Sequence, residues 1–547
     1  MGTGMKRISA LFIGLLFTFS SVATAQDLSR EAKKAKAYVA EVEKHLLESY
    51  VDRAKMTEEG LNEVGLEGLE SGLKKEAFSE LPSEIRAEII AMIQASETVA
   101  DAIEGVDQII GDEDFEFLLF ADGATNSMVK STGDPFSKIL TQKEFNKLLS
   151  TLRGGSKKLL LGVSVRAKDG EVMYVQYGYP AYEAGMEIGD RILKVDGKSI
   201  KGKSQTELND MLKLKEGAIR KVLVKKKGHK KNYLFKIRPF SSEPENVKIK
   251  YLGRGVGYMR IGMFDLNLAK EVKSGLEDLK EQGMEAFILD LRNNPGGALP
   301  AATAVADLFL PHGLLITETK SNYKPNLFGM KLPGAGGDQT FETKKKKSEF
   351  EEMPMVVLIN HASASASELL SGALQDHKRA LLIGEKTYGK GVGQSPVMLS
   401  SVMMKRFLYL TVMEYTLPTG RSIHHKGVSP DIVYSTKKPS AEDFAARWEI
   451  RGNGQLEKWL DRTWDRYQDK YKELAEYDGF DSGNYPAFKR FYSSLNTTLD
   501  PDLVRAELRR AIRSRVSQEE KRSWVADLET DVQLQRGLVG VLEKMEQ

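Results

Sequence analysis

The stretch from Met355 to Gln394 constrains the fold of this chain more than any other. It begins with an apolar run, Met355–Ile359, whose length and composition predict a buried strand. Three serines then alternate with alanine, and an apolar helical pattern follows them through Leu374. A second apolar run, residues 380–383, leads to Lys390, which has a glycine on each side. A strand, a turn of small residues and a helix form an arrangement in which α/β enzymes present a nucleophile.

A serine nucleophile needs a base, and the sequence offers two kinds. Lys390 must be neutral to act as one, so its pKa must fall from about 10.4 by about 3, a cost of roughly 4 kcal/mol. Burial in an apolar pocket can lower a lysine pKa by that amount. The alternative base is one of the seven histidines: His361 lies four residues before Ser365, and His424 and His425 follow a predicted turn. A histidine base is not excluded, but Lys390 is the sharper candidate, because its glycine neighbours allow a tight, partly buried loop. The residue pattern alone does not separate the three serines.

The amino terminus has the composition of a secretory signal peptide. Lys6 and Arg7 precede an apolar stretch, Ile8–Phe19, and Ala23–Ala25 then supplies an A-x-A cleavage site. The apolar stretch is shorter than the ~20 residues of a membrane-spanning helix. We therefore expect residues 1–25 to be removed, no stable membrane span, and export to the periplasm or cell envelope.

Composition excludes several functions. The net charge of +3 is too small for an electrostatic commitment to nucleic acid. The chain has no cysteine, which rules out disulfides, a thiol nucleophile and a thiolate metal site. We expect no nucleic acid partner, no cofactor and no metal.

Periodicity and turn signals divide the chain into four further regions. Their boundaries are 26–150 for a helical N-terminal region, 156–241 for a domain of short strands, 245–436 for an α/β core and 440–547 for a helical C-terminal region. Within them, the polar segment 322–352 predicts a loop, Asp500 before Pro501 predicts a helix start, and Trp524 to Leu538 predicts a last helix. We expect the helical regions to be structural or to support a homo-oligomer.

The chain resembles the carboxyl-terminal processing, or tail-specific, serine proteases. The segments that carry the resemblance are Leu289–Gly297, Ser363–Glu368, Gly372–Asp376, Gly384–Gly391, Pro418–Ile423 and Gly427–Asp431. The strand-rich domain resembles a PDZ domain, through Tyr179–Ala181, Ala184–Gly185 and Gly189–Gly197. The resemblance implies a multidomain α/β fold: a mixed α/β protease core of crotonase-like ββα units, an inserted PDZ-like β domain, and helical N- and C-terminal regions.

The resemblance also implies roles for single residues. By position, Ser365 is the nucleophile, Lys390 the general base, Gln394 its support, and the N–H groups of Gly297 and Ala366 the oxyanion hole. An acidic third member maps to Asp376. An unbroken helix would separate it from the nucleophile by roughly 16 Å, so we expect Asp376 to orient a neighbouring segment.

PDZ domains bind the extended carboxyl end of a peptide by strand addition. The implied carboxylate grip is Leu161, Gly162 and Val163. The resemblance therefore implies an exported serine endopeptidase that acts through an acyl-enzyme on protein or peptide substrates with apolar C-termini. The alternative is a non-catalytic PDZ-type peptide-binding protein, which failure of a serine-directed probe to label Ser365 would favour.

Overall fold

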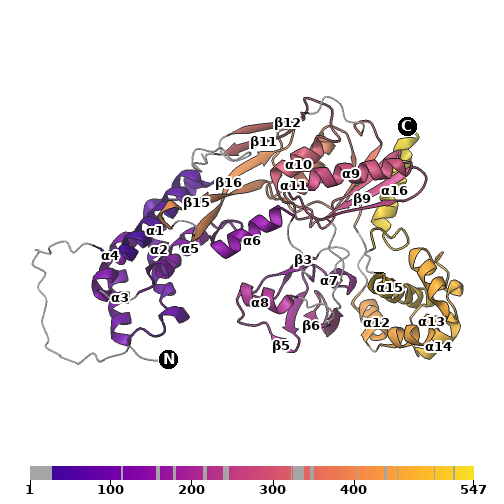
Figure 1. Cartoon of the computed structure of the whole chain (residues 1–547), viewed down its shortest axis with the longest axis horizontal. Coiled ribbons are helices and arrows are strands. Elements are labelled where there is room, and N and C mark those ends of the chain that lie inside the picture. The colour runs from indigo at the N-terminus through magenta and orange to yellow at the C-terminus, as the bar shows by residue number, and fades with distance from the viewer. Residues whose placement is uncertain are drawn as a thin grey trace, which may run out of the picture. The chain divides into compact units, whose positions relative to one another are not determined.

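The computed structural model describes residues 28–111, 115–154, 161–175, 180–213, 219–237, 246–321, 323, 338–344, 350–402, 405–435, 440–452, 454–497, 499–520 and 524–547. The expected signal peptide lies outside these residues. The chain divides into two compact units, and Figure 1 labels most of their helices and strands. One comprises 1–44, 56–133 and 399–403, and the other comprises 45–55, 134–398 and 404–547.

The first unit is helical, as its periodicity predicts. Its helices are α1 (Arg30–Ser49, whose last turn belongs to the second unit), α2 (Glu58–Gly72), α3 (Ser83–Ala95), α4 (Val99–Ile110) and α5 (Phe117–Ser131). Short 3-10 helices lie at Arg53–Lys55, Glu76–Phe78, Ser400–Val402 and Ser482–Asn484 in the two units.

Helices α2 and α5 pack with their backbones in contact. A Cβ at Gly123 would lie 2.3 Å from the Gly68 carbonyl oxygen, so this crossing requires glycine.

A six-stranded sheet forms the centre of the second unit. Its order is β17 (Ile432–Val433), β14 (Leu381–Gly384), β13 (Met355–Ile359), β10 (Ala286–Asp290), β9 (Val256–Ile261) and β8 (Val247–Tyr251). All neighbours are parallel except β8 and β9. The predicted apolar runs at 355–359 and 380–383 are confirmed as strands. Their continuous apolar character arises because helices cover both faces of the sheet.

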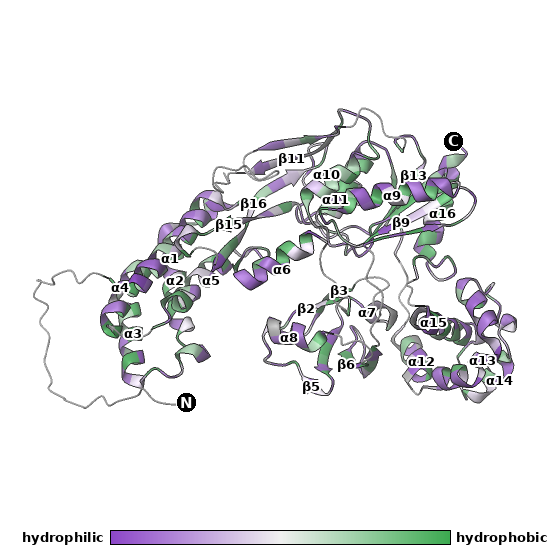
Figure 2. Ribbon diagram, viewed as in Figure 1, coloured by the Kyte–Doolittle hydropathy of each residue, from purple (hydrophilic) through white to green (hydrophobic). Residues whose placement is uncertain are grey.

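Alternate residues of these strands enter two separate hydrophobic clusters. Met259, Leu289 and Val357 point to one face, which α9 (Leu268–Glu281), α10 (Leu299–Ala306) and α11 (Ala366–Asp376) cover. Tyr258 and Val356 point to the opposite face, which α16 (Val532–Met545) covers. Figure 2 shows α10 as a predominantly hydrophobic ribbon, whereas α9 and α11 carry both hydrophobic and hydrophilic residues. The sheet is therefore the middle layer of three.

A second sheet has the order β1 (Lys138–Thr141), β16 (Arg406–Thr416), β11 (Leu315–Ser321), β12 (Gln339–Glu342), and β15 (Val392–Met398) also pairs with β16. Helix α6 (Gln142–Leu152) follows β1. Two strands here were not predicted. Strand β1 lies in the region predicted to be mainly helical, and β16 supplies its hydrogen-bond partner from far along the chain. Strand β12 lies in the predicted loop 322–352, much of which falls outside the described residues.

The predicted strand-rich domain contains two small sheets. Its elements are β2 (Val163–Val165), β3 (Val172–Val175), α7 (Pro180–Glu183), β4 (Arg191–Val195), β5 (Lys198–Ser199), α8 (Gln205–Leu212), β6 (Arg220–Lys225) and β7 (Asn232–Ile237). Strands β2 and β3 pair with each other, and the other sheet has the order β5-β4-β6-β7. Phe444 and Trp448, on α12 (Ala441–Gly452), pack into the hydrophobic core of this domain.

The C-terminal region is helical, as predicted. It contains α12, α13 (Gln455–Glu476), α14 (Phe488–Ser494), α15 (Pro501–Glu519) and α16. Asp500 caps α15 as expected, because its side chain accepts from Asp502 N–H at 2.7 Å. The last helix begins at Val532 and not at Trp524, because Asp531 caps it and Trp524 instead packs among α13, α14 and α15. Within the described residues, no helix combines the length and apolar character needed to cross a membrane.

Candidate active site

Three neighbouring strands bring the candidate residues together. Strands β10, β13 and β14 are parallel and adjacent, so their carboxyl ends meet at one edge of the sheet. The segment with Gly296 and Gly297 follows β10, the three serines follow β13, and Lys390 follows β14. Ligands of open α/β sheets bind at such an edge. The strand order therefore places all three segments at one candidate site.

Ser365 stands immediately before α11 with a backbone that favours glycine. Its φ is 56° and its ψ is −116°, a conformation that strains a residue with a side chain. A Cβ on Gly296 would lie 2.7 Å from Ser365 Cβ and 2.6 Å from the Ala364 carbonyl oxygen. Gly296 is thus required for the segment after β10 to lie against the turn that holds Ser365.

The fold distinguishes the three serines. Ser363 and Ser367 are fully buried, and their hydroxyls donate to Leu291 O at 2.8 Å and Asn294 O at 3.0 Å. Both acceptors belong to the segment after β10, so these hydroxyls join two segments of the site. Ser365 is only half-buried. Of the three serines, only Ser365 is both partly exposed and located at the start of α11.

Glu368 connects the Ser365 segment to the Lys390 segment. One carboxylate oxygen, Oε2, accepts both Ser365 N–H and Lys390 N–H at 2.8 Å. The other, Oε1, accepts Gly389 N–H at 2.7 Å and the Thr387 hydroxyl. Glu368 is fully buried, and burial raises its pKa against the lowering effect of these four donors. A single buried carboxylate therefore sets the spacing of the two backbones.

Lys390 is largely buried, and this burial lowers its pKa from the ordinary 10.5 to about 8. The charge of Asp134 raises this pKa, Lys138 lowers it and Glu368 raises it, all less than burial does. Its Nζ donates to Gln394 Oε1 at 2.8 Å, and Gln394 Nε2 donates to Thr411 Oγ1 at 3.0 Å. Gln394 thus orients the ammonium.

The hydrogen bonds between described residues include none from Ser365 Oγ to Lys390 Nζ. Tyr415 contacts the Lys390 segment: its hydroxyl donates to the Lys390 carbonyl oxygen, and its N–H donates to Gly391 O at 3.0 Å. Burial and the charge of Glu368 raise the pKa of Tyr415, and a side-chain hydrogen bond with Ser365 opposes them.

Two N–H groups near Ser365 are open to a ligand. Gly296 N–H is occupied, since it donates to Asn294 Oδ1 at 2.9 Å. With acceptors in the described part of the chain, neither Gly297 N–H nor Ala366 N–H makes a hydrogen bond. Gly297 has φ 148° and pairs with Phe264, whose carbonyl oxygen would lie 2.2 Å from a Cβ at that position. Ala366 is the first residue of α11, whose amino end favours negative charge.

Asp376 lies at the opposite end of α11 from Ser365. Its carboxylate accepts Thr419 N–H at 3.0 Å and the Thr419 hydroxyl at 2.7 Å, and it forms an ion pair with Arg421 at 2.7 Å. These contacts hold the turn after β16 and do not reach the serine.

The histidines occupy two places. His361 is exposed, and its Nδ1 lies 2.8 Å from Glu385 Oε2. His424 and His425 have ring centroids 3.9 Å apart, and the His425 N–H donates to Gly389 O at 2.8 Å. Burial lowers the pKa of His424. The His424–His425 pair therefore packs beside the Lys390 loop.

The predicted carboxylate grip lies at the start of β2. Leu161 is buried, Gly162 has φ 71°, and Val163 is the first residue of the strand. Strand β2 pairs with β3 on one side, and Val165 O accepts from Gln205 Nε2 at 2.8 Å. Gln205 opens α8, so this helix stands beside the strand.

A buried ionic network at the end of β10 was missed. Asp290 accepts from Tyr258, Arg260 and Arg292, and Arg292 also bonds both carboxylate oxygens of Asp531, at 2.8 and 2.6 Å. Burial alone would raise the Asp290 pKa, but the two arginines and the hydrogen bonds lower it to about 2. A charged pair directly after an apolar strand was a usable signal for Asp290 and Arg292, whereas nothing marked Asp531.

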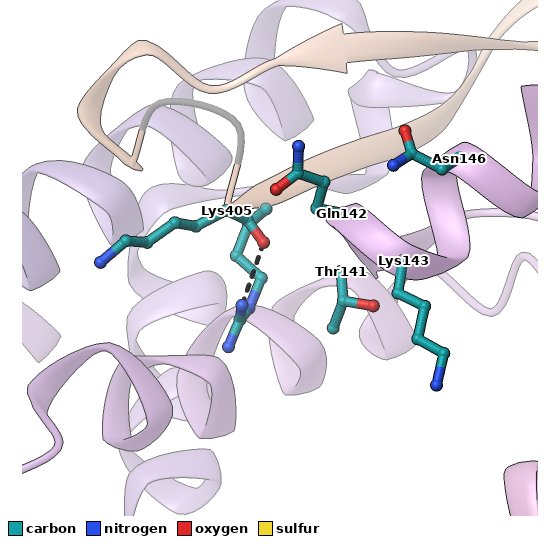
Figure 3. A pocket seen from close by; sticks show the side chains of 6 residues that line it. Thr141, Gln142, Lys143, Asn146 and Lys405 are labelled. Carbon is teal, nitrogen blue, oxygen red and sulfur yellow. Dashed lines mark hydrogen bonds between the residues drawn. The ribbon is translucent and has the colours of Figure 1, made fainter.

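Among the described residues, no group of three or more His, Asp or Glu side chains is placed to hold a metal ion. A surface hollow of about 580 Å³ lies between α6 and β16 (Figure 3). The residues that line it are Thr141, Gln142, Lys143, Asn146, Lys405 and Arg406. None of the candidate residues lines this hollow, and we assign it no role.

Comparisons with known proteins match two regions of the chain to known families. Residues 255–434 match the model of peptidase family S41, and residues 171–226 match a PDZ domain. A carboxyl-terminal-processing protease of Synechocystis is 32% identical over 319 residues, which cover 57% of this chain and 70% of that protein. A probable CtpA-like serine protease of Staphylococcus haemolyticus is 31% identical over 314 residues, 57% of this chain and 59% of that protein. The photosystem II D1 C-terminal processing protease has a structure that matches with a TM-score of 0.49 and 24% identity, over 73% of this chain and 93% of that one.

The matched regions define a serine protease with a PDZ domain. The chain belongs to the carboxyl-terminal-processing proteases of peptidase family S41.

Proposed function

We propose that this protein is an exported serine endopeptidase in which Ser365 and Lys390 form a catalytic dyad. It cleaves protein substrates recognised by their carboxyl ends. One observation supports the dyad above the others: Glu368 Oε2 binds the N–H groups of both residues at 2.8 Å, so their backbones share one anchor.

The proposed reaction proceeds through an acyl-enzyme. Ser365 Oγ attacks the peptide carbonyl carbon while its proton moves to Lys390 Nζ. The N–H groups of Gly297 and Ala366 stabilise the resulting oxyanion. When the C–N bond breaks, Lys390 returns that proton to the leaving amine. Water then attacks the ester, Lys390 takes its proton, and Ser365 Oγ recovers a proton as the C–O bond breaks.

Lys390 suits this role because it is basic enough to take a proton and neutral often enough to start. With a pKa of about 8, about a tenth of the molecules hold a neutral lysine at pH 7. Gln394 fixes the direction of Nζ, while Asp376 acts at a distance by holding the turn at Thr419. In the reaction, Ser365 must turn its hydroxyl toward Nζ.

The PDZ domain would recruit substrates with apolar carboxyl ends. Strand β2 has an edge that no described strand pairs, so a peptide can add there between β2 and α8. The backbone of Leu161, Gly162 and Val163 would bind the terminal carboxylate. We further infer cleavage after Ala25, a periplasmic or cell-envelope location, self-association through the helical regions, and crotonase-like ββα units in the core.

The test uses an unfolded model protein and a fluorophosphonate probe. Wild type should cleave the protein and label at Ser365, as mass spectrometry of the labelled peptide would report. Ser365→Ala and Lys390→Ala should each lose at least about 1,000-fold in kcat/KM. Lys386, an exposed lysine four residues before the base, supplies the matched control Lys386→Ala, which should keep wild-type activity.

Two results would contradict the proposal. Full activity of Lys390→Ala, with loss on replacing His361, His424 or His425, would assign the base to a histidine. Absence of both cleavage and labelling in wild type would favour the peptide-binding alternative. Model proteins that differ only in their last three residues would test recognition by the PDZ domain.

A further inference from the structure

A short segment between α5 and β1 covers the amine of Lys390. Lys390 Nζ lies 4.3 Å from the centroid of the Phe136 ring. That distance is within the range of about 6 Å for an interaction between a cation and an aromatic face. Phe136 therefore touches the nitrogen that must accept the proton, although it belongs to neither the serine nor the lysine segment.

Hydrogen bonds fix the segment that carries Phe136. The Asp134 carboxylate accepts Phe136 N–H at 2.9 Å and the Ser137 hydroxyl at 2.5 Å. Ser137 Oγ in turn accepts Thr411 N–H at 2.9 Å. The tight turn at Asp134 thus fixes the backbone of Phe136 relative to β16.

Thr411 connects Lys390 to the segment that carries Phe136. Thr411 holds Ser137 through its N–H and holds Gln394 through its hydroxyl, at 3.0 Å. Gln394 then accepts from Lys390 Nζ at 2.8 Å. Thr411 is buried on β16. A continuous path of hydrogen bonds therefore runs from the Phe136 segment to the amine that the ring covers.

Charged groups approach Lys390 from several elements. Asp134 comes from the segment of the cover, Lys138 from β1 and Glu368 from α11. The turn after β16 adds His424, which packs against Gly391 and interacts with Asp134 and with Glu414 of β16. These charges act in opposite directions, and burial has the largest effect on the Lys390 pKa. What covers the amine therefore matters more than any single charge.

We propose that Phe136 is a positioning residue for proteolysis, whose ring keeps water away from Lys390 Nζ and so maintains Lys390 as a usable base. The proposal rests on the proposed role of Lys390. Water exclusion favours the neutral amine, whereas the ring face favours the ammonium. Because burial dominates, exclusion of water is the effect that counts. Removal of the ring should let water reach the amine and raise its pKa toward 10.5.

The first experiment measures the pH profile of kcat/KM for wild type, Phe136→Ala and Phe136→Leu. Wild type should show a rising limb with a midpoint near pH 8. In Phe136→Ala the midpoint should rise by about one pH unit or more, so that activity at pH 7 falls about tenfold and recovers near pH 9.5. Phe136→Leu should keep the midpoint at or below the wild-type value, because leucine excludes water without attracting the ammonium.

The matched control is Phe145→Ala. Phe145 lies nine residues later, is also half-buried, and stacks on Phe407 with ring centroids 3.9 Å apart. This substitution should leave the midpoint unchanged. An unchanged midpoint in Phe136→Ala would overturn the inference, and so would an equal loss of activity at every pH, which indicates damage to the fold. A midpoint in Phe136→Leu as high as that in Phe136→Ala would also contradict it.

A second readout does not depend on turnover. In a Ser365→Ala background, the rate at which acetic anhydride modifies Lys390 is followed against pH by mass spectrometry. Phe136→Ala should shift this midpoint upward as well. If Lys390→Ala stays active, the proposed dyad is wrong. The acetylation rate still tests whether the Phe136 ring keeps water away from Lys390 Nζ. If Lys390→Ala is inactive and the labelling midpoint does not move, the dyad stands and the role of Phe136 is overturned.

Discussion

Glu368 joins the Ser365 and Lys390 segments through a single carboxylate. Its four hydrogen bonds come from groups that are spread over 26 positions, from Ser365 to Lys390. All four partners are donors, so both oxygens of the Glu368 side chain must act as hydrogen-bond acceptors. The geometry of the proposed dyad therefore depends on a side chain that takes no proton itself.

Glu368→Gln should lower kcat by about 100-fold, because the new amide NH₂ would face N–H donors and shift both segments. The measurement is kcat on a model substrate, together with the rate of fluorophosphonate labelling. Glu385→Gln is the control, since Glu385 bonds His361 and Ser435 and should change kcat less than about twofold. A Glu368→Gln enzyme within threefold of wild type would refute this role.

At pH values below its lowered pKa, Lys390 is charged and should reduce the free energy of unfolding. Burial lowers that pKa from 10.5 to about 8, so a charged Lys390 costs about 3 kcal/mol below pH 8. Between pH 8 and 10.5 the unfolded chain binds the extra proton, so stability rises with pH through this window. Above 10.5 the lysine is neutral in both states.

Lys390→Met should therefore abolish proteolysis and raise the free energy of unfolding at pH 7. The difference between variant and wild type should be largest below pH 8 and should shrink as pH rises toward 10.5. Urea unfolding at several pH values measures it. If the variant is less stable than wild type at pH 7, the cost assigned to the buried charge is wrong.

At the level of single residues, the sequence predicted the strand, the turn and the candidate pair, but not the contacts that select Ser365. The hydroxyls of Ser363 and Ser367 are engaged by carbonyl groups 72 and 73 residues away. Glu368 stood inside a recognised segment with no assigned role, because three of its four partners lie about 20 residues downstream. Phe136 gave no signal at all.

Helix α16 supports the ends of the strands that carry the site. Gln533 Nε2 donates to Ile359 O at 2.9 Å and to Ile383 O at 3.0 Å. Ile359 is the last residue of β13, and Ile383 is the last but one of β14, where the chain leaves the sheet toward Ser365 and toward Lys390. Asp531, the N-cap of the helix, binds Arg292 just after β10. The first turn of α16 thus contacts all three strand ends.

Gln533→Ala should leave two buried carbonyls without this donor, at a cost of about 2–4 kcal/mol in the free energy of unfolding. Activity should fall at least about tenfold even where the variant is folded, because both segments lose support. Thermal unfolding and kcat/KM measure the two effects. Arg536→Ala, at an exposed position of the same helix, should change neither. Normal activity of folded Gln533→Ala would show that the helix only covers the sheet.

At the scale of helices and strands, sequence periodicity predicts some elements and misses others. Apolar runs predicted β13 and β14, and a proline after aspartate predicted the start of α15. The same method extended the last helix back to Trp524, because an apolar spacing does not reveal that Trp524 packs against other helices. Strand β1 was missed because its partner lies about 270 residues away.

At the scale of the whole molecule, the C-terminal region completes two other parts of the chain. Helix α16 covers one face of the central sheet, and α12 contributes Phe444 and Trp448 to the core of the PDZ domain. Phe444 lies 5.1 Å from the Tyr233 ring and 4.7 Å from Lys226 Nζ. The order of regions could be predicted from the sequence, but this packing joins residues about 200 positions apart.

Phe444→Ala should destabilise the PDZ domain by about 3 kcal/mol, the usual cost of removing a buried phenylalanine. Hydrogen exchange of the amides in β6 and β7 should quicken, while exchange in β13 should not change. Phe488→Ala, which opens the separate cluster of the C-terminal helices, is the control and should leave β6 and β7 protected. Unchanged exchange in Phe444→Ala would mean that the PDZ core is complete without α12.

The close contact between α16 and the sheet has a consequence for the evolution of the family. A Cβ at Gly537 would lie 2.9 Å from Leu358 Cδ2, and one at Gly540 would lie 3.1 Å from Ile383 Cδ1. A lineage that gains a side chain at either position must shrink the strand residue opposite it. Substitutions at 537 and 358 should therefore covary among descendants that keep this tail, and a tail transferred between homologues would need its matching strands.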